Sequence, residues 1–180
     1  MIQSPLLLVL LKTLGEILGK TDGYLVGSGA VLMFCPSMSH RIDDLDIVFP
    51  LGTTFREVLD LFKTKNPTLR LTLTNHTIMC DKVKVIDLLR PCKYRKPPPI
   101  MEVNGIRVLT PYYLLVRYKV DISYGDKKAT GWNEYERKKL PANKEKVKAL
   151  KEAGENGLDL SKPTTLSSSV EDDTTRRRLF

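Results

Sequence analysis

Hydrophobic residues recur along the chain at two spacings, one typical of helices and one typical of strands. Apolar residues at helical spacing, together with capping residues, predict helices over residues 6–18, 30–34, 53–62 and 110–120. Short apolar or alternating runs bounded by Gly, Pro, Asn or Asp predict strands. These runs cover residues 24–26, 45–49, 69–73, 75–80, 83–89 and 106–108. This order predicts an α+β domain in which helices flank a small mixed sheet.

The composition changes after the last of these helices. Residues 133–152 are strongly charged and predict a further helical region, in which Pro141 is a candidate break. From Gly154 onward the chain is rich in Ser, Thr, Asp and Arg and poor in apolar residues, which is typical of disorder. We therefore predict a core over 1–125, a basic helical extension over 126–154 and a disordered tail over 155–180.

The charge of the chain favours anionic partners. The 180 residues include 42 % hydrophobic residues, enough for a packed core, and carry a formal net charge of +8. Between residues 127 and 152, nine Lys or Arg residues stand against four Glu, a local charge of +5. Two interpretations of this region stay open. It is either a solvated helical face or a contact surface for RNA, for DNA or for a protein, with Trp132 and Tyr135 as stacking candidates.

The cysteines and the N-terminal residues exclude several classes of protein. Cys35, Cys80 and Cys92 form neither a Cys-x-x-Cys pair nor a cluster with histidine, which argues against a disulfide framework and a structural zinc site. A reducing, intracellular compartment fits best, with the cytoplasm preferred over the nucleus. The apolar run 6–11 lacks the basic flank and the cleavage site of a signal peptide. No run approaches the roughly 20 apolar residues of a membrane span, so we expect no membrane partner.

An Asp-x-Asp motif at the strand 45–49 carries candidate chemistry. Because side chains alternate between the two faces of a strand, its odd-numbered apolar residues share a face suited to the core. Asp44 and Asp46 then share the opposite face, and Asp43 falls outside this pair. Two carboxylates spaced about 7 Å apart along a strand can ligate one divalent cation between them. The alternative interpretation is a solvated strand end.

A third carboxylate interrupts the apolar strand 83–89. An ionised Asp87 in such a strand is costly unless it is paired or bound to metal. If this strand lies beside 45–49, three carboxylates converge and can hold two metals about 3.5–4 Å apart. Ligand sets made only of oxygen favour Mg²⁺ or Mn²⁺ over zinc. A structural ion pair of Asp87 with Lys84 or Arg90 is the competing interpretation.

Small residues end the strand 24–26 and open the next helix. Gly27-Ser28-Gly29 lets a phosphate group approach backbone N–H groups, and the positive end of a helix favours negative charge there. The same three residues are also common in an ordinary structural turn. The glycine segment and the carboxylate motifs, found together in this order and at this spacing, are a stronger indication of a functional site than either motif by itself.

Together these motifs resemble the nucleotidyltransferase superfamily, which includes DNA polymerase β, CCA-adding enzymes and aminoglycoside nucleotidyltransferases. The similarity covers about residues 20–120, and its closest match is the minimal, abortive-infection-toxin-like branch. Gly27-Ser28 matches the glycine motif that follows the first strand, and the carboxylate motifs follow in the family's order. In that branch a later helix often carries an apolar pair followed by a lysine, and residues 114–119 look like it. His40 and Ile42 stand where the branch often has Arg and then Thr or Ser, and Arg41 is shifted by one position.

The resemblance implies a polymerase β-like fold and a metal-dependent reaction. The enzyme would move a nucleoside monophosphate from a nucleoside triphosphate to a hydroxyl of a protein, an RNA or a small molecule, with release of pyrophosphate. Asp44, Asp46 and Asp87 would bind two Mg²⁺ or Mn²⁺ ions, and Asp87 would also help to activate the acceptor hydroxyl. The nucleotide would be bound by Gly27, Ser28, Arg41 and Lys119.

Two alternatives to this enzyme stay open from the sequence. One is a catalytically silent relative that binds nucleotide or nucleic acid through the same fold. The other is a basic nucleic-acid-binding module whose carboxylates are incidental to its function. The two differ from the enzyme in measurable ways, because the first binds nucleotide without turnover and the second binds RNA or DNA with a steep salt dependence.

Overall fold

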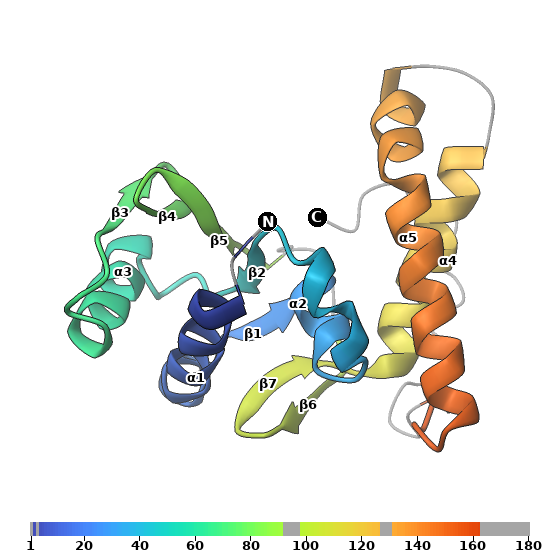
Figure 1. Ribbon diagram of the computed structural model, residues 1–180, viewed down its shortest axis with the longest axis horizontal. Coiled ribbons are helices and arrows are strands. Elements are labelled where there is room, and N and C mark those ends of the chain that lie inside the picture. Colours follow the sequence, from blue (N-terminus) through green and yellow to red (C-terminus); the bar gives the residue numbers. More distant parts are fainter. Residues whose placement is uncertain (1, 3, 92–97, 127–130, 163–180) are drawn as a thin grey trace. The chain divides into compact units, whose positions relative to one another are not determined.

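The computed structural model describes residues 2, 4–91, 98–126 and 131–162 (Figure 1). Contacts group the described chain into two compact units, with the boundary between Leu109 and Thr110. The predicted core boundary at residue 125 stays a prediction. Most of the predicted tail lies outside the described residues. Among the described helices, none is both long enough and apolar enough to cross a membrane.

Seven strands of the described chain form one mixed sheet in the first unit (Figure 1). They are β1 (Tyr24–Val26), β2 (Leu45–Val48), β3 (Leu71–Thr74), β4 (Thr77–Cys80), β5 (Val83–Leu89), β6 (Ile100–Val103) and β7 (Ile106–Leu109). Their order across the sheet is β3-β4-β5-β2-β1-β7-β6. The pairs β1–β7 and β2–β5 are parallel, and the other pairs are antiparallel. The α+β class with a mixed sheet, predicted from the element order, is confirmed.

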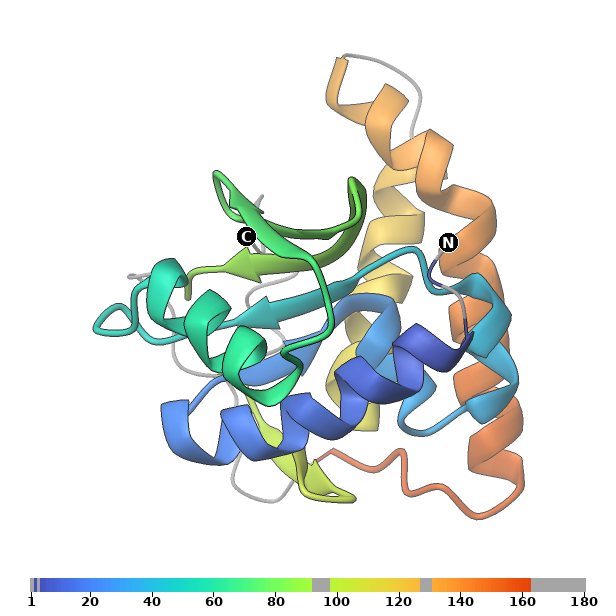
Figure 2. The same ribbon diagram turned by 60° about the vertical axis from the view of Figure 1, so that its left-hand side comes forward.

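Helices cover the apolar face of this sheet. The first unit contains α1 (Ser4–Thr21), α2 (Gly27–Leu32), the 3₁₀ helix η1 (Pro36–Arg41) and α3 (Phe55–Lys65). Phe49 follows β2 and lies against Gly23, two residues after the end of α1, while Leu45 lies against Gly29 of α2. Figure 2 shows α1 and α3 lying side by side against the strands. These contacts bury the apolar face of β2 completely.

Helix α3 illustrates how local signals fix an element. Thr54 caps it: the Thr54 hydroxyl accepts from the Glu57 N–H, and the Glu57 carboxylate accepts from the Thr54 N–H at 2.7 Å. This capping box satisfies two of the free N–H groups at the start of the helix. At the other end, the amide of buried Asn66 donates to the Thr13 hydroxyl at 2.9 Å and to the Phe62 carbonyl at 3.0 Å. The C-terminus of α3 is therefore tied to α1.

Helix α2 and strand β6 differ from the sequence prediction, and the 3₁₀ helix η1 was not predicted. Helix α2 begins at Gly27 and not at residue 30, because Gly27 adopts a φ of +63° that turns the chain directly from β1 into the helix. Strand β6 was not predicted, although Asn104-Gly105 joins it to β7 with φ values of +52° and +77°. Asn-Gly at such angles is the preferred two-residue hairpin turn, so this strand had a readable signal.

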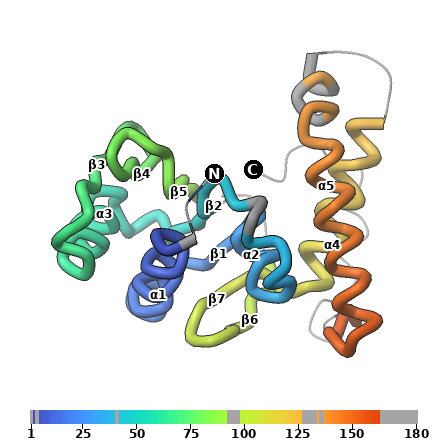
Figure 3. The backbone as a smooth tube through the Cα atoms, viewed as in Figure 1, coloured from blue at the N-terminus to red at the C-terminus, as the bar shows by residue number. Residues whose placement is uncertain are grey.

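The second unit consists of two long helices packed together, α4 (Pro111–Asp126) and α5 (Gly131–Glu155), which Figure 3 traces as adjacent tubes. Helix α5 continues through Pro141, so the predicted candidate break does not interrupt it. Proline removes one backbone hydrogen bond from a helix interior. Buried Asn143 and Leu150 follow it in the same helix, and their packing holds the segment helical.

Candidate metal centre

The pairing of β2 with β5 brings three carboxylates together. The two strands are parallel neighbours, as the sequence analysis required, and their register sets Asp46 opposite Asp87. One carboxylate oxygen from each of Asp44, Asp46 and Asp87 lies within 4.8 Å of the others, and all three residues are half-buried. Asp43 is exposed and lies outside this group. We call these three residues the carboxylate cluster.

The alternation of β2 separates this cluster from the core. Leu45 and Ile47 are fully buried on the face that the helices cover. Asp44, directly before the strand, and Asp46 within it lie on the opposite face, where a carboxylate can reach solvent or a ligand. The strand therefore supplies core packing and ligand atoms from alternate positions.

Gly27 brings backbone close to the cluster. Its neighbour Val26 is paired with Asp46 across β1 and β2. A Cβ atom added to Gly27 would overlap the Asp46 carboxylate, and its φ of +63° is a conformation that L side chains rarely adopt. Glycine is thus required at this position for two independent reasons. Ser28 follows in the first turn of α2 and is half-exposed.

Thr77 holds the third carboxylate in place. It lies on β4 directly opposite Asp87, and its hydroxyl donates to the Asp87 Oδ1 atom at 2.7 Å. Because this hydrogen bond uses Oδ1, the Oδ2 atom of Asp87 can contact other partners. The sequence pattern does not single out Thr77, because an irregularity near Ile78 and Met79 shifts the pairing of β4 with β5.

Lys84 supplies the positive charge next to the cluster. Its Nζ atom lies 2.5 Å from Asp44 Oδ2 and 2.5 Å from Asp87 Oδ2. Burial by itself lowers the pKa of Lys84, but the hydrogen bonds and charges of Asp44 and Asp87 outweigh it and raise the pKa above its ordinary value. Lys84 is therefore an ammonium ion at neutral pH. The ion pair with Asp87 considered in the sequence analysis is present, and it also includes Asp44.

Arg90, the other partner considered for Asp87, has different contacts. Its guanidinium donates to the Pro50 carbonyl at 2.6 Å and stacks over the Phe55 ring at 4.1 Å from the ring centre. It connects the end of β5 to the start of α3. Lys84 is consequently the cation that the structure shows bridging the cluster.

The donor set fits a divalent cation. Oxygen ligands at about 2.1 Å from one Mg²⁺ ion lie up to about 4.2 Å apart, close to the spacing in the cluster. The three carboxylates carry a formal charge of −3, and the Lys84 ammonium offsets only one unit of it, so the cluster attracts a divalent cation. Within the described part of the chain, no other group of three His, Cys, Asp or Glu side chains comes within ligand distance. Cys35 and Cys80 are buried and form no disulfide, and Cys92 is not among the described residues.

The two remaining nucleotide contacts expected from the sequence lie elsewhere. Arg41 ends η1, and its side chain is outside the described part of the structure. Lys119 is exposed on α4, which belongs to the second unit. Their assignment to the triphosphate stays a prediction.

Much of the basic charge of α5 is balanced inside its own unit. Lys146 lies over the ring of buried Tyr118, 4.7 Å from its centre. Three further lysines form exposed ion pairs: Lys138 with Glu134, Lys148 with Glu152, and Lys144 with Asp126. The side chains of Trp132 and Tyr135 are outside the described part of the structure. The pairs fit a solvated face, and a role in binding nucleic acid stays a prediction.

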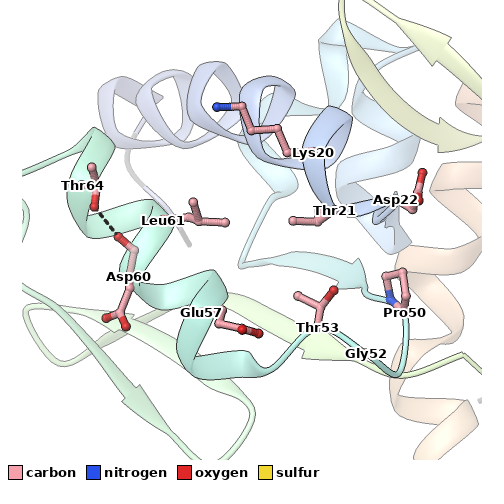
Figure 4. A pocket seen from close by; sticks show the side chains of 10 residues that line it. All are labelled: Lys20, Thr21, Asp22, Pro50, Gly52, Thr53, Glu57, Asp60, Leu61 and Thr64. Carbon is pink, nitrogen blue, oxygen red and sulfur yellow. Dashed lines mark hydrogen bonds between the residues drawn. The ribbon is translucent and has the colours of Figure 1, made fainter.

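An open groove of about 690 Å³ lies apart from the carboxylate cluster (Figure 4). It is formed by the end of α1, the loop after β2 and helix α3. Its lining residues are Lys20, Thr21, Asp22, Pro50, Gly52, Thr53, Glu57, Asp60, Leu61 and Thr64. The three acidic members have structural partners, since Glu57 belongs to the capping box, Asp22 pairs with Arg107 and Asp60 pairs with Arg56. The groove therefore adds no ligand to the cluster.

Comparisons with known proteins test the fold. No protein-family model matches the chain, and a search of curated proteins finds no relative by sequence. Solved structures do resemble it. An antigenic nucleotidyltransferase-like protein from Paracoccidioides brasiliensis superposes with a TM-score of 0.54 at 11 % identity, over 83 % of this chain and 77 % of that one.

Two further structures are similar to a lesser degree. The Megavirus polyadenylate synthase gives a TM-score of 0.48 at 15 % identity, over 84 % of this chain and 34 % of that one. The antibiotic-resistance factor ANT(2'')-Ia gives 0.45 at 16 % identity, over 86 % and 94 %. The likeness to the Paracoccidioides protein shows that this chain has the nucleotidyltransferase fold, as its motifs predicted.

Proposed function

We propose that the chain is a metal-dependent nucleotidyltransferase, which moves a nucleoside monophosphate from a nucleoside triphosphate to a hydroxyl acceptor and releases pyrophosphate. One observation carries this proposal. The register of β2 and β5 brings Asp44, Asp46 and Asp87 within 4.8 Å of one another, in a chain with the nucleotidyltransferase fold. Neither feature suffices by itself, because acidic clusters are common and folds host many functions.

The proposed roles follow from the donors present. Asp44, Asp46 and Asp87 would hold two Mg²⁺ or Mn²⁺ ions, and a bound divalent metal supplies stabilisation of the charge on the reacting phosphate oxygens. The backbone at Gly27 and Ser28 would receive the triphosphate beside Asp46, since Gly27 has no side chain of its own and lies against that carboxylate. Asp87, oriented by Thr77, would accept the proton of the attacking hydroxyl. Arg41 and Lys119 would neutralise further phosphate charge.

A transfer assay tests this function. The chain is incubated with each α-labelled nucleoside triphosphate, with Mg²⁺ or Mn²⁺, and with RNA, protein and small-molecule acceptors. We expect label transfer, and a loss of at least about 100-fold in Asp46→Asn and in Asp87→Asn, because each change removes a ligand charge from the cluster. Asp43→Asn is the matched control, since Asp43 neighbours the motif but lies outside the cluster. Equal transfer by the cluster variants and the wild type would refute the proposal.

The position of Lys84 favours one second candidate. An ammonium group already bridges Asp44 and Asp87, as expected if the chain were a catalytically silent relative that binds nucleotide or nucleic acid. Calorimetry separates the two functions. Saturable binding of ATP, with no transfer from any of the four triphosphates, would support the silent relative.

A further inference from the structure

Lys84 reaches the carboxylate cluster because of a β-bulge. In a regular strand, residues three apart point to opposite faces, so Lys84 and Asp87 would be separated by the sheet. The pairing of β4 with β5 sets Ile78 opposite Ile86 but Met79 opposite Lys84, which leaves Val85 as an extra residue in β5. Val85 and Ile86 are both fully buried, so the alternation resets at this point. The bulge thereby directs Lys84 to the side of Asp87.

The Lys84 ammonium occupies oxygens that a divalent cation would use. Asp44 Oδ2 and Asp87 Oδ2 each lie 2.5 Å from its Nζ atom. A Mg²⁺ or Mn²⁺ ion between the same two carboxylates would lie about 2.1 Å from its ligand oxygens. Two cations at these distances from shared oxygens would repel each other strongly. The ammonium and the metal are therefore alternative occupants.

We propose that Lys84 is an internal competitor of the metal, whose ammonium must leave Asp44 and Asp87 before a divalent cation can bind the carboxylate cluster. The inference deepens the proposed function and rests on it for the identity of the metal. In the absence of metal, Lys84 holds Asp44 and Asp87 together by offsetting part of their charge. The same ion pairs set how tightly the cluster takes up metal.

The surroundings of Lys84 permit this exchange. Its side chain is 46 % exposed, whereas those of Asp44 and Asp87 are 20 % and 15 % exposed. A flexible four-carbon stem can move the ammonium into solvent without a change in the backbone. Ion pairs that reach solvent are weak, so the displacement costs little compared with the free energy of metal coordination. Lys84 therefore lowers the metal affinity without abolishing it.

Direct metal binding tests the competition. The full-length chain is titrated with Mn²⁺, and free Mn²⁺ is measured by electron paramagnetic resonance. We expect Lys84→Met, which keeps an unbranched side chain but removes the charge, to bind Mn²⁺ about tenfold more tightly than the wild type. The matched control is Lys82→Met. It removes one positive charge from the adjacent turn, where Lys82 is exposed, and should change the affinity by less than about twofold.

The outcomes separate this inference from the proposed function. Binding by both proteins, tighter in Lys84→Met, supports both. Binding by Lys84→Met with none by the wild type supports the competition and overturns the enzyme in favour of the silent relative. Equal or weaker binding by Lys84→Met overturns the competition and leaves the enzyme standing. No Mn²⁺ binding by either protein overturns both.

A second measurement guards against a variant that merely folds poorly. Lys84→Met removes the cation that is paired with Asp44 and Asp87, so it should unfold at a lower temperature than the wild type in a chelating buffer. Saturating Mn²⁺ should then raise its midpoint more than that of the wild type, because tighter binding to the native state adds more stability. Lys84→Gln should behave in the same way. An equal or smaller Mn²⁺-induced shift in both variants contradicts the competition.

Discussion

At the scale of single residues, Gly27 is the position with the least freedom. Its positive φ and the nearby Asp46 carboxylate both exclude a side chain. The sequence pattern predicts that glycine here lets a phosphate group approach the backbone. The structure adds that glycine is also needed to fit the backbone against the carboxylate cluster.

Gly27→Ala should reduce both stability and activity. A non-glycine residue in the left-handed region costs about 1–2 kcal/mol, and the added methyl group must also displace the Asp46 carboxylate. We expect the free energy of unfolding, measured by urea denaturation, to fall by at least about 1 kcal/mol, and label transfer to fall with it. Gly52→Ala is the control, because its Cβ would meet nothing within 4 Å. Equal stabilities of the two variants would contradict the role of Gly27.

The sequence predicted the three carboxylates and offered Lys84 as a partner of Asp87, but it revealed neither Thr77 nor the contact of Lys84 with Asp44. Asp44 and Asp46 follow from the two-residue period of a strand, and Asp87 follows from its apolar surroundings. Thr77 and the bridging position of Lys84 depend on the bulge in β5, which shifts the pairing by one residue. If the register next to the Asp81-Lys82 turn continued without the bulge, Thr77 would lie opposite Ile86 and not opposite Asp87. The alternation of polar and apolar residues along a strand does not reveal a one-residue shift in its pairing.

At the scale of elements, local signals determined most helices and strands. Helix α3 starts at the capping Thr54, as the sequence allowed, and β5 has the predicted bounds. The hairpin of β6 and β7 was missed despite its Asn-Gly turn, because β6 itself has a weak apolar pattern, with Met101 and Glu102 exposed. The Asn-Gly turn is thus a better indicator of β6 than the residues of β6 themselves.

The capping box of α3 should make stability depend on pH. Hydrogen bonds from the backbone and the hydroxyl of Thr54 lower the pKa of Glu57 below its ordinary value of 4.5. A carboxylate with a lowered pKa stabilises the folded state above the unfolded-state pKa, and this contribution is lost as the pH falls through the folded-state pKa. Glu57→Gln should therefore be less stable than the wild type at pH 7.

This difference should disappear in acid. Urea denaturation at about pH 7 and at about pH 3 measures it, with Glu102→Gln as the control, since Glu102 is exposed in β6 and not at a helix start. A destabilisation by Glu57→Gln that is as large in acid as at neutral pH would show that the Glu57 charge has no part in the cap.

At the scale of the whole molecule, the carboxylate cluster and the basic excess belong to different units. The first unit holds the acidic cluster and the sheet, whereas residues 127–152 of the second carry a net charge of +5. The sequence located this excess, but it could not show that Lys138 and Lys148 pair with carboxylates on α5 itself and Lys144 with Asp126 of α4. Such pairs depend on side-chain conformations that composition does not reveal.

If the second unit contacts an RNA acceptor, binding should depend on salt. We expect single-stranded RNA to bind more weakly as salt rises, and Arg137→Glu combined with Lys139→Glu to reduce the slope of log affinity against log salt by about 1 or more. Lys12→Glu combined with Lys63→Glu makes the same charge change on α1 and α3 and is the control. Fluorescence anisotropy measures both. An equal effect of the two pairs would show that only net charge matters.

The same titration with Asp46→Asn separates the two remaining classes of function. RNA binding that survives this change, in a protein that transfers no label, identifies a basic binding module with incidental carboxylates. Loss of transfer with RNA binding retained is the result expected of an enzyme.

The order of the strands also determines which part of the sheet is the last to unfold locally. In the order β3-β4-β5-β2-β1-β7-β6, β2 is the central strand, with three strands on each side. Local unfolding begins at sheet edges, where backbone groups have a partner on one side only. Fraying of β3 or β6 therefore leaves Asp46 and Asp87 in register. The mutually repelling carboxylates thus lie on the two strands that thermal fluctuations separate least often. The centre of the sheet can therefore accommodate a destabilising cluster that would unfold an edge strand.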